Sequence, residues 1–289
     1  MTEPRIQGRA PGLDRGQLLA LQRPRHDRGL IVGRIRQHLD QADGYVAFSG
    51  GKDSLVALHM ALAAEPAIPV AFFDSGLEFP ETYAYIADLA RDWKLHLHWV
   101  TAKPSLLEVL HASGAWDHHR AQPAAIPDLH QILIGAPSAA AHQAHGPGEV
   151  WGVRAAESRG RAALYGRALR EETSRSCAGC CPPGPGPGGR QRRARHGGVI
   201  RRGDGTVAYG PVWDWPDDEI WAYIRRHRLP ANPVYDKLRR LGAPEISLRV
   251  SAMIDGNGLE FGRVTWLRRG WPDLFEELAR VLPRLREFV

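Results

Sequence analysis

Short apolar runs alternate along the chain with segments in which apolar residues recur at helical spacing. Four runs predict buried β-strands, at residues 45–49, 69–73, 95–100 and 150–153. Helical patterns follow the first, second and fourth of these runs, after Asp53, from about 80 to 93 and from 155 to 170. Strands that alternate with helices imply right-handed crossovers and a parallel sheet. We therefore expect an α/β fold with a doubly wound, mostly parallel sheet.

The remaining segments suggest how the chain is organised around that sheet. Residues 199–202 and 206–209 flank Gly-Asp-Gly and predict a hairpin, and further helices are expected near 216–228 and 272–287. Residues 182–189 are all Pro or Gly, which predicts a mobile loop. We divide the chain into an N-terminal helical extension, a nucleotide-binding domain with an insertion at 101–148, a mobile loop rich in Cys, Pro, Gly and Arg, and a smaller helical and hairpin region of the same domain: 1–42, 43–170, 171–205 and 206–289.

Composition places the chain among folded proteins and leaves the ligand open. Hydrophobic residues make up 43% and charged residues 24%, and the chain contains 9 Trp. No apolar stretch approaches the roughly 18 residues of a membrane span, and residues 1–15 show no apolar signal region, so we expect a cytoplasmic protein. The formal net charge of +6 suits an anionic ligand such as a nucleotide or a nucleic acid.

Residues 49–54, Ser-Gly-Gly-Lys-Asp-Ser, join the first predicted strand to the first helix, and we call them the phosphate loop. Backbone N–H groups converge on an anion at such a junction. Gly50 and Gly51 allow close approach to a phosphate, Lys52 adds a positive charge, and the hydroxyls of Ser49 and Ser54 can donate hydrogen bonds. A Walker A loop is excluded because an Asp follows the lysine. The alternative is an ordinary glycine turn.

Polar residues also follow the second and fourth predicted strands. Asp74 could order Mg²⁺ or accept a ribose hydroxyl, or it could cap the following helix, while Ser75 and Gly76 would let a ligand lie close. Arg154 could grip an oxyanion with two hydrogen bonds, or it could form a surface salt bridge. Arg159 is a weaker candidate of the same kind, because an arginine-rich helix face needs no ligand.

The phosphate loop resembles the PP-loop of the adenine nucleotide alpha hydrolase superfamily. Phe73-Asp-Ser-Gly-Leu-Glu-Phe-Pro-Glu-Thr82, with Gly152-Val-Arg154 and Glu157-Ser-Arg159, resembles the phosphoadenosine phosphosulfate reductase family in particular. The resemblance implies a Rossmann-like sheet that binds an adenine nucleotide, either ATP or phosphoadenosine phosphosulfate. The nucleotide-binding set is then Ser49, Gly50, Gly51, Lys52, Ser54, Ser75, Gly76, Gly152, Arg154 and Arg159, and the catalytic set is Lys52, Asp53 and Asp74.

The cysteines depart from that family. Its reductases attack the sulfate with a C-terminal cysteine, whereas here no cysteine follows Cys181 in the sequence. Cys177, Cys180 and Cys181 could hold an iron–sulfur cluster, or Zn²⁺ with His196 as a fourth ligand, or they could be three thiols without a ligand. Histidine pairs at 118–119 and 142–145 are weaker metal candidates.

Three functions therefore compete at the sequence level. The missing C-terminal cysteine favours chemistry at the alpha phosphate of ATP, by adenylation or pyrophosphate release and with sulfur transfer as an extension, with Mg²⁺ held near Asp53 or Asp74. The alternatives are a thiol-dependent phosphoadenosine phosphosulfate or adenosine phosphosulfate reductase of sulfate assimilation, and a non-catalytic nucleotide-binding partner. The arginines of 190–195, with Arg201 and Arg202, could attract a nucleic-acid or protein acceptor, or they could form only a solvated linker.

Overall fold

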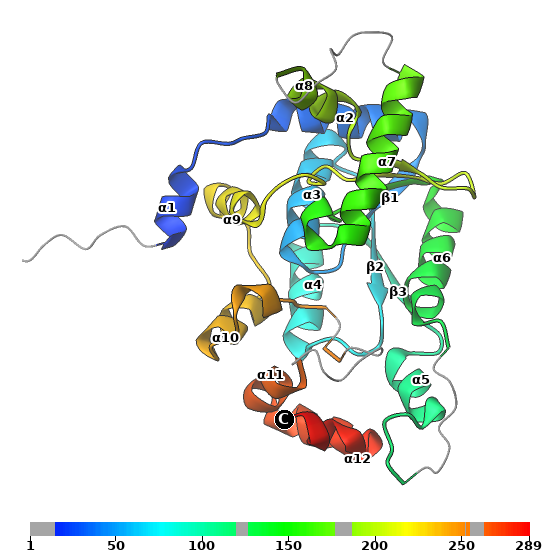
Figure 1. Cartoon of the computed structure of the whole chain (residues 1–289), viewed down its shortest axis with the longest axis vertical. Coiled ribbons are helices and arrows are strands. Elements are labelled where there is room, and N and C mark those ends of the chain that lie inside the picture. The colour runs from blue at the N-terminus through cyan, green and yellow to red at the C-terminus, as the bar shows by residue number, and fades with distance from the viewer. Residues whose placement is uncertain (1–14, 120–126, 177–186, 252, 255–262) are drawn as a thin grey trace, which may run out of the picture.

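The computed structural model describes residues 15–119, 127–176, 187–251, 253–254 and 263–289 (Figure 1). Six strands form one sheet in the order β3-β2-β1-β4-β6-β5. Every neighbouring pair is parallel except β5 and β6, which form the expected antiparallel hairpin. The prediction of a doubly wound, mostly parallel α/β fold is therefore confirmed. The strands are β1 (Gly44–Ala47), β2 (Pro69–Asp74), β3 (His96–Thr101), β4 (Gly148–Trp151), β5 (Val199–Arg201) and β6 (Val207–Tyr209).

Helices cover both faces of this sheet, because adjacent residues of a strand point to opposite sides. Val46 of β1 packs in the main buried cluster with the helix after the phosphate loop, whereas the neighbouring Tyr45 packs against Ala141 on the other face. The α-helices are α1 (Arg15–Leu21), α2 (Arg28–Gln41), α3 (Lys52–Ala64), α4 (Pro80–Asp92), α5 (Leu106–Ser113), α6 (Ala136–His145), α7 (Arg159–Ser176), α8 (Pro187–His196), α9 (Asp217–Arg226), α10 (Val234–Arg240), α11 (Arg263–Gly270) and α12 (Pro272–Val281). None of the helices in the described ranges is long and apolar enough to cross a membrane.

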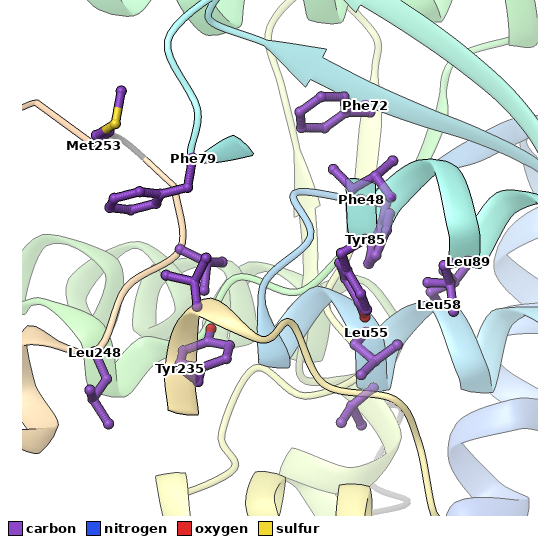
Figure 2. Close-up of a cluster of buried hydrophobic side chains, with 14 of the residues drawn as sticks. Phe48, Leu55, Leu58, Phe72, Phe79, Tyr85, Leu89, Tyr235, Leu248 and Met253 are labelled. Carbon is purple, nitrogen blue, oxygen red and sulfur yellow. The ribbon is translucent and has the colours of Figure 1, made fainter. Parts of the chain in front are cut away.

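The main buried cluster joins distant parts of the sequence and extends from Ile31 to Leu285. Figure 2 shows that this cluster contains side chains of α3 (Leu55 and Leu58), α4 (Tyr85 and Leu89) and α10 (Tyr235). Burial of Leu or Phe side chains stabilises a fold by about 1.5–3 kcal/mol each. The C-terminal helices therefore belong to the same hydrophobic core as the sheet, and this core brings α9 and α10 to the phosphate loop.

Two segments differ from the sequence expectation. The segment 101–148, expected as an insertion, supplies α5 and α6, and α6 packs on the sheet in the crossover between β3 and β4. The expected mobile loop at 171–205 contains the end of α7, the whole of α8 and β5. Pro187 begins α8, where proline is tolerated, and the Arg193 guanidinium of α8 lies 4.4 Å from the Trp213 ring centroid. The rest of the predicted loop, residues 177–186, lies outside the described residues.

Candidate functional site

The phosphate loop lies where the direction of winding changes across the sheet. β1 pairs with β2 on one side and with β4 on the other, so the connections after β1 and β4 diverge at the carboxyl ends of these strands. Ligands of open α/β sheets bind in the crevice at such a switch point. Lys52, Asp53 and Ser54 open α3 at this position, and Arg154 follows β4. The topology thus brings the two predicted cationic residues together.

Two glycines fit the loop tightly against its surroundings. Gly50 has a φ of +71°, a left-handed conformation that glycine adopts at little cost. A Cβ atom on Gly152 would lie 2.4 Å from the backbone nitrogen of Ser54, so the end of β4 packs directly against the first turn of α3. Gly152 therefore has a packing role beside its predicted place in the nucleotide-binding set.

Hydrogen bonds within the protein hold the phosphate loop in shape. The Ser54 hydroxyl donates to the Gly51 carbonyl at 3.0 Å and lies 3.1 Å from the Ser49 hydroxyl. The Tyr235 hydroxyl accepts from the Lys52 backbone N–H at 3.0 Å. The Asn232 side-chain amide donates to the Gly50 carbonyl at 3.3 Å. Sequence reasoning missed Asn232 and Tyr235, because nothing in the pattern of residues 229–237 indicates contact with a loop about 180 residues earlier.

Lys52 and Arg154 form a closed ion-pair network with two aspartates. Lys52 Nζ lies 2.9 Å from both Asp53 Oδ2 and Asp217 Oδ1. Arg154 Nε lies 2.7 Å from Asp53 Oδ1, and Arg154 Nη2 lies 3.0 Å from Asp217 Oδ1. The third guanidinium nitrogen, Nη1, donates to the Trp215 carbonyl at 3.0 Å. Arg154 is therefore a buried member of the loop's own framework as well as a candidate for ligand binding.

The two aspartates of this network differ in exposure and in pKa. Side-chain exposure is 15% for Asp53 and 49% for Asp217. Burial raises the pKa of Asp53, against the opposing effect of Lys52 and Arg154. Partial burial also acts to raise the pKa of Asp217, but Lys52 and Arg154 outweigh it and hold this pKa below its ordinary value. Sequence analysis placed Asp217 only within the helix expected near 216–228 and so missed its contacts with Lys52 and Arg154.

Asp74 lies in a separate set of contacts at the end of β2. Its Oδ1 accepts from the Gly76 backbone N–H at 2.8 Å and from the Tyr83 hydroxyl at 2.9 Å. Its Oδ2 accepts from Trp99 Nε1 at 2.9 Å and, at the longer distance of 3.5 Å, from the Thr101 hydroxyl. Asp74 is thus buried and bonded to uncharged protein donors, and it is not part of the Lys52 network.

The other predicted residues fall into different surroundings. The Ser75 hydroxyl donates to Glu78 Oε1 at 2.8 Å, and Gly76 has a φ of +75° with Ser105 packed against it. Arg159 is exposed at the start of α7, and among the described residues it makes no ion pair. Cys177, Cys180 and Cys181 lie outside the described residues. These positions leave a larger group of predicted residues that meet at the loop: Ser49, Gly50, Gly51, Lys52, Asp53, Ser54, Gly152 and Arg154.

The contacts of the acidic residues do not fit the expected Mg²⁺ ion. Both oxygens of Asp53 contact cations, and both oxygens of Asp74 accept from protein donors, so neither carboxylate has a face free for a metal. In the part of the chain that the structure describes, no group of three or more His, Cys, Asp or Glu could hold a metal ion. We derive no step through Mg²⁺.

A parallel α/β sheet with a lysine-bearing loop at its switch point defines a nucleotide-binding protein. Residues 44–247 match the family model described as the phosphoadenosine phosphosulfate reductase domain. The chain belongs to this family, and the resemblance drawn from the phosphate loop and from residues 73–82 is confirmed.

Curated relatives carry the same family name. The chain is 25% identical over 210 residues to the phosphoadenosine 5'-phosphosulfate reductase of Alkalilimnicola ehrlichii, covering 70% of this chain and 69% of that protein. It is 28% identical over 201 residues to the reductase of Xanthomonas oryzae pv. oryzae, with 70% and 69% covered. Among solved structures, the phosphoadenylyl-sulfate reductase of Candida auris in a phosphate complex is similar with a TM-score of 0.46 and 18% identity, covering 78% of this chain and 96% of that one.

Proposed function

We propose that the phosphate loop binds an adenine sulfonucleotide, phosphoadenosine phosphosulfate or adenosine phosphosulfate, and that the protein catalyses its thiol-dependent reduction. The observation that carries this proposal is the family match over residues 44–247, which includes the whole Lys52 network. The match favours the reductase over chemistry at the alpha phosphate of ATP, which the cysteine positions alone had favoured. In this proposal Lys52 and Arg154 neutralise the phosphate and sulfate oxygens of the ligand.

The reduction needs two thiols. A thiolate attacks the sulfate sulfur, the bond between sulfur and the bridging oxygen breaks, and the adenosine phosphate leaves with that oxygen. The second thiol then attacks the resulting thiosulfonate, which releases sulfite and leaves a disulfide. Lys52 and Arg154 stabilise the negative charge that gathers on the leaving phosphate.

We assign the attacking thiol to a separate dithiol protein of the thioredoxin type. The cysteines of this chain follow directly on Ser176, the last residue of α7. α7 has 18 residues, so Ser176 lies about 25 Å along the helix from Arg159, the first residue of α7. In Figure 1, α7 leads from the centre of the molecule toward α8 at the top. A donor that docks from solvent needs no thiol of this chain at the loop.

No cysteine lies among the described residues around the phosphate loop, which supports a second candidate. If no thiol reaches the ligand, the intact Lys52 loop could still bind ATP and stabilise charge on its alpha phosphate as pyrophosphate leaves. In that reaction an acceptor oxygen attacks the alpha phosphorus and becomes adenylated. Lys52, Asp53 and Arg154 would have the same contacts in both reactions, so the products must decide between them.

The deciding experiment measures binding and products with one set of variants. Calorimetric titration with phosphoadenosine phosphosulfate, adenosine phosphosulfate and ATP is carried out on the wild type, on Lys52→Met and on Lys94→Met. Lys94 is an exposed lysine two residues before β3, at the other end of the strand from the loop, and serves as the control. Binding of a sulfonucleotide that is weakened about tenfold or more in Lys52→Met alone supports the proposed site.

Sulfite and pyrophosphate release are then measured with thioredoxin and its reducing system. Sulfite from a sulfonucleotide supports the reductase, and pyrophosphate from ATP with an added acceptor supports the second candidate. Tight nucleotide binding with neither product would return the protein to the third function, a non-catalytic partner. Sulfite release that is lost in a Cys177→Ser, Cys180→Ser, Cys181→Ser variant would show that the chain supplies its own thiol and would contradict the assignment to a separate donor.

A further inference from the structure

One carboxylate oxygen bridges the two cations of the candidate site. Asp217 Oδ1 lies 2.9 Å from Lys52 Nζ and 3.0 Å from Arg154 Nη2. A phosphate or sulfate oxygen bound by the same ammonium and guanidinium groups would take this position, because such charge-assisted contacts have the same length of about 2.7–2.9 Å. The carboxylate of Asp217 therefore stands where the proposed function requires an oxygen of the ligand.

The charges of the network add up to zero in this state. Lys52 and Arg154 contribute two positive charges, and Asp53 and Asp217 contribute two negative charges. A loop whose cations are already neutralised attracts an anion weakly. A sulfonucleotide therefore has to replace one of the two carboxylates to gain both cations.

Asp53 and Asp217 are not equally replaceable. Asp53 lies in the first turn of α3 with 15% of its side chain exposed, and its two oxygens contact different cations. Asp217 is 49% exposed and uses a single oxygen for both contacts. A half-exposed carboxylate regains water when its ion pairs break, whereas a buried one does not. Asp217 also lies in the first turn of α9, where the helix dipole favours a negative charge without any cation.

We propose that Asp217 is a placeholder for the ligand. Its carboxylate occupies the oxyanion position of the phosphate loop and exchanges with an oxyanion of the sulfonucleotide. In this role Asp217 is a positioning residue: it keeps Lys52 and Arg154 aligned in the empty site and moves aside when the ligand binds. It also sets specificity, because an anion must compete with a carboxylate to enter, which favours the phosphosulfate group, with its two negative charges, and inorganic sulfate over singly charged anions. The inference rests on the proposed function of the loop.

The test measures inorganic sulfate binding and sulfonucleotide binding separately. Asp217→Asn and Asp217→Ala are expected to bind both probes roughly three- to tenfold more tightly than the wild type. Neither variant has the half-exposed carboxylate that competes with the anion for Lys52 and Arg154. The alanine variant is included because an asparagine amide could itself donate to the anion. Asp218→Asn is the matched control: Asp218 is the next residue of the same helix turn, 41% exposed, and pairs with Arg25 at 2.8 Å. We expect no change in this control.

The outcomes separate this inference from the proposed function. Tighter sulfate binding in both Asp217 variants that is lost when Lys52→Met is added supports the exchange. This holds even if no sulfonucleotide binds, and in that case only the proposed function fails. Unchanged or weaker sulfate binding in the alanine variant, with the thermal transition retained, overturns the inference. So does sulfate binding that persists in Lys52→Met, because the anion would then lie elsewhere. Absence of sulfate binding in every variant overturns it as well.

The selectivity for sulfate over chloride is a further measurement, which a purely structural role of Asp217 would leave unchanged. The ratio of sulfate affinity to chloride affinity is expected to fall in Asp217→Ala, because a singly charged anion no longer has to displace a carboxylate. An unchanged ratio in a folded variant would contradict the specificity role.

Discussion

Two acidic centres lie at the carboxyl ends of neighbouring strands and are built in opposite ways. After β1, Asp53 and the more distant Asp217 are held by the cations of Lys52 and Arg154. At the end of β2, Asp74 is held by uncharged donors, among them the Tyr83 hydroxyl and the Trp99 indole. The difference lies in what each centre can exchange. A cation can pass from a protein carboxylate to a ligand anion, whereas a buried neutral donor loses free energy when its acceptor leaves.

This contrast gives the two centres different functions. The network around Lys52 is suited to ligand exchange, and we expect substitutions there to change binding. The Asp74 centre fixes the turn that leads from β2 to α4, because the Tyr83 side chain of α4 and the Trp99 side chain of β3 both donate to it. We expect substitutions there to change stability more than binding.

The largest effect is expected from Arg154→Gln, which removes one of the two cations that hold Asp53 and Asp217. Asp53 would lose its contact with Arg154 Nε while it remains mostly buried. Removing one partner of a buried ion pair costs about 3–5 kcal/mol. The free energy of unfolding is measured by urea denaturation, with Arg159→Gln as the control because Arg159 is exposed. A loss below about 1 kcal/mol would show that Asp53 does not depend on Arg154.

Asp74→Asn tests the centre at the end of β2, where uncharged donors hold the carboxylate. The substitution keeps one acceptor oxygen but points an amide N–H₂ group at donors that already face this side chain. A buried donor left without an acceptor costs about 1–3 kcal/mol, so we expect a loss near 2 kcal/mol in the free energy of unfolding. Sulfonucleotide affinity, measured by calorimetry at a temperature where the variant is folded, should stay within about twofold. Weaker binding by tenfold or more without loss of stability would instead make Asp74 a ligand-binding residue.

Comparison of these centres also shows what the sequence can predict. Strand, loop and helix could be predicted at the phosphate loop because the apolar run, the glycines and Lys52 are consecutive in the chain. The position of Arg154 beside this loop followed from strand order. By contrast, Asp217 and Tyr235 reach the loop only through the packing of α9 and α10 in the common core, which leaves no local pattern.

The chemical state of a predicted residue is similarly difficult to read from sequence. Asp74 was placed correctly at the end of a strand, but it does not cap the following helix: the N-cap of α4 is Phe79, and Asp74 instead accepts from the Gly76 N–H. Its remaining partners, Tyr83, Trp99 and Thr101, come from α4 and β3, so the saturation of its oxygens depends on tertiary contacts. Whether a carboxylate is available to a ligand thus depends on residues that the motif does not include.

Tyr235→Phe is expected to have a smaller effect, and it tests whether the Tyr235 hydroxyl shapes the phosphate loop. The change removes the acceptor of the Lys52 backbone N–H and should cost about 1.5 kcal/mol in the free energy of unfolding. Tyr85→Phe is the control, since its hydroxyl donates to the Pro230 carbonyl at 2.9 Å and not to the backbone of the phosphate loop. Both variants should lose stability, but only Tyr235→Phe should weaken sulfonucleotide binding. Equal affinities in the two variants would show that the Tyr235 hydroxyl does not shape the loop for its ligand.

The smallest effect concerns His26, a cation held between two carboxylates. His26 loses its charge as the pH rises. His26 Nδ1 lies 3.0 Å from Glu219 Oε1, and His26 Nε2 lies 3.3 Å from Asp214 Oδ1. Partial burial acts to lower the pKa of His26, but Asp214 and Glu219 outweigh it and raise this pKa to about 9 from its ordinary 6.5. A raised pKa in the folded state adds stability that is fully present below pH 6.5 and is lost as the pH rises through about 9.

This pH dependence can be isolated by comparing the wild type with His26→Gln. Between pH 6.5 and 9.5 the wild type should lose roughly 1 kcal/mol more than the variant in the free energy of unfolding, because solvent screens this partly exposed cluster. Other titrating groups affect both proteins alike, so the difference reports His26. If the two curves stay parallel over this range, the two carboxylates do not hold a charged His26. The cluster would then stabilise the fold through the stacking of His26 on Trp215, whose ring centroids are 5.1 Å apart, which does not depend on the charge of the ring.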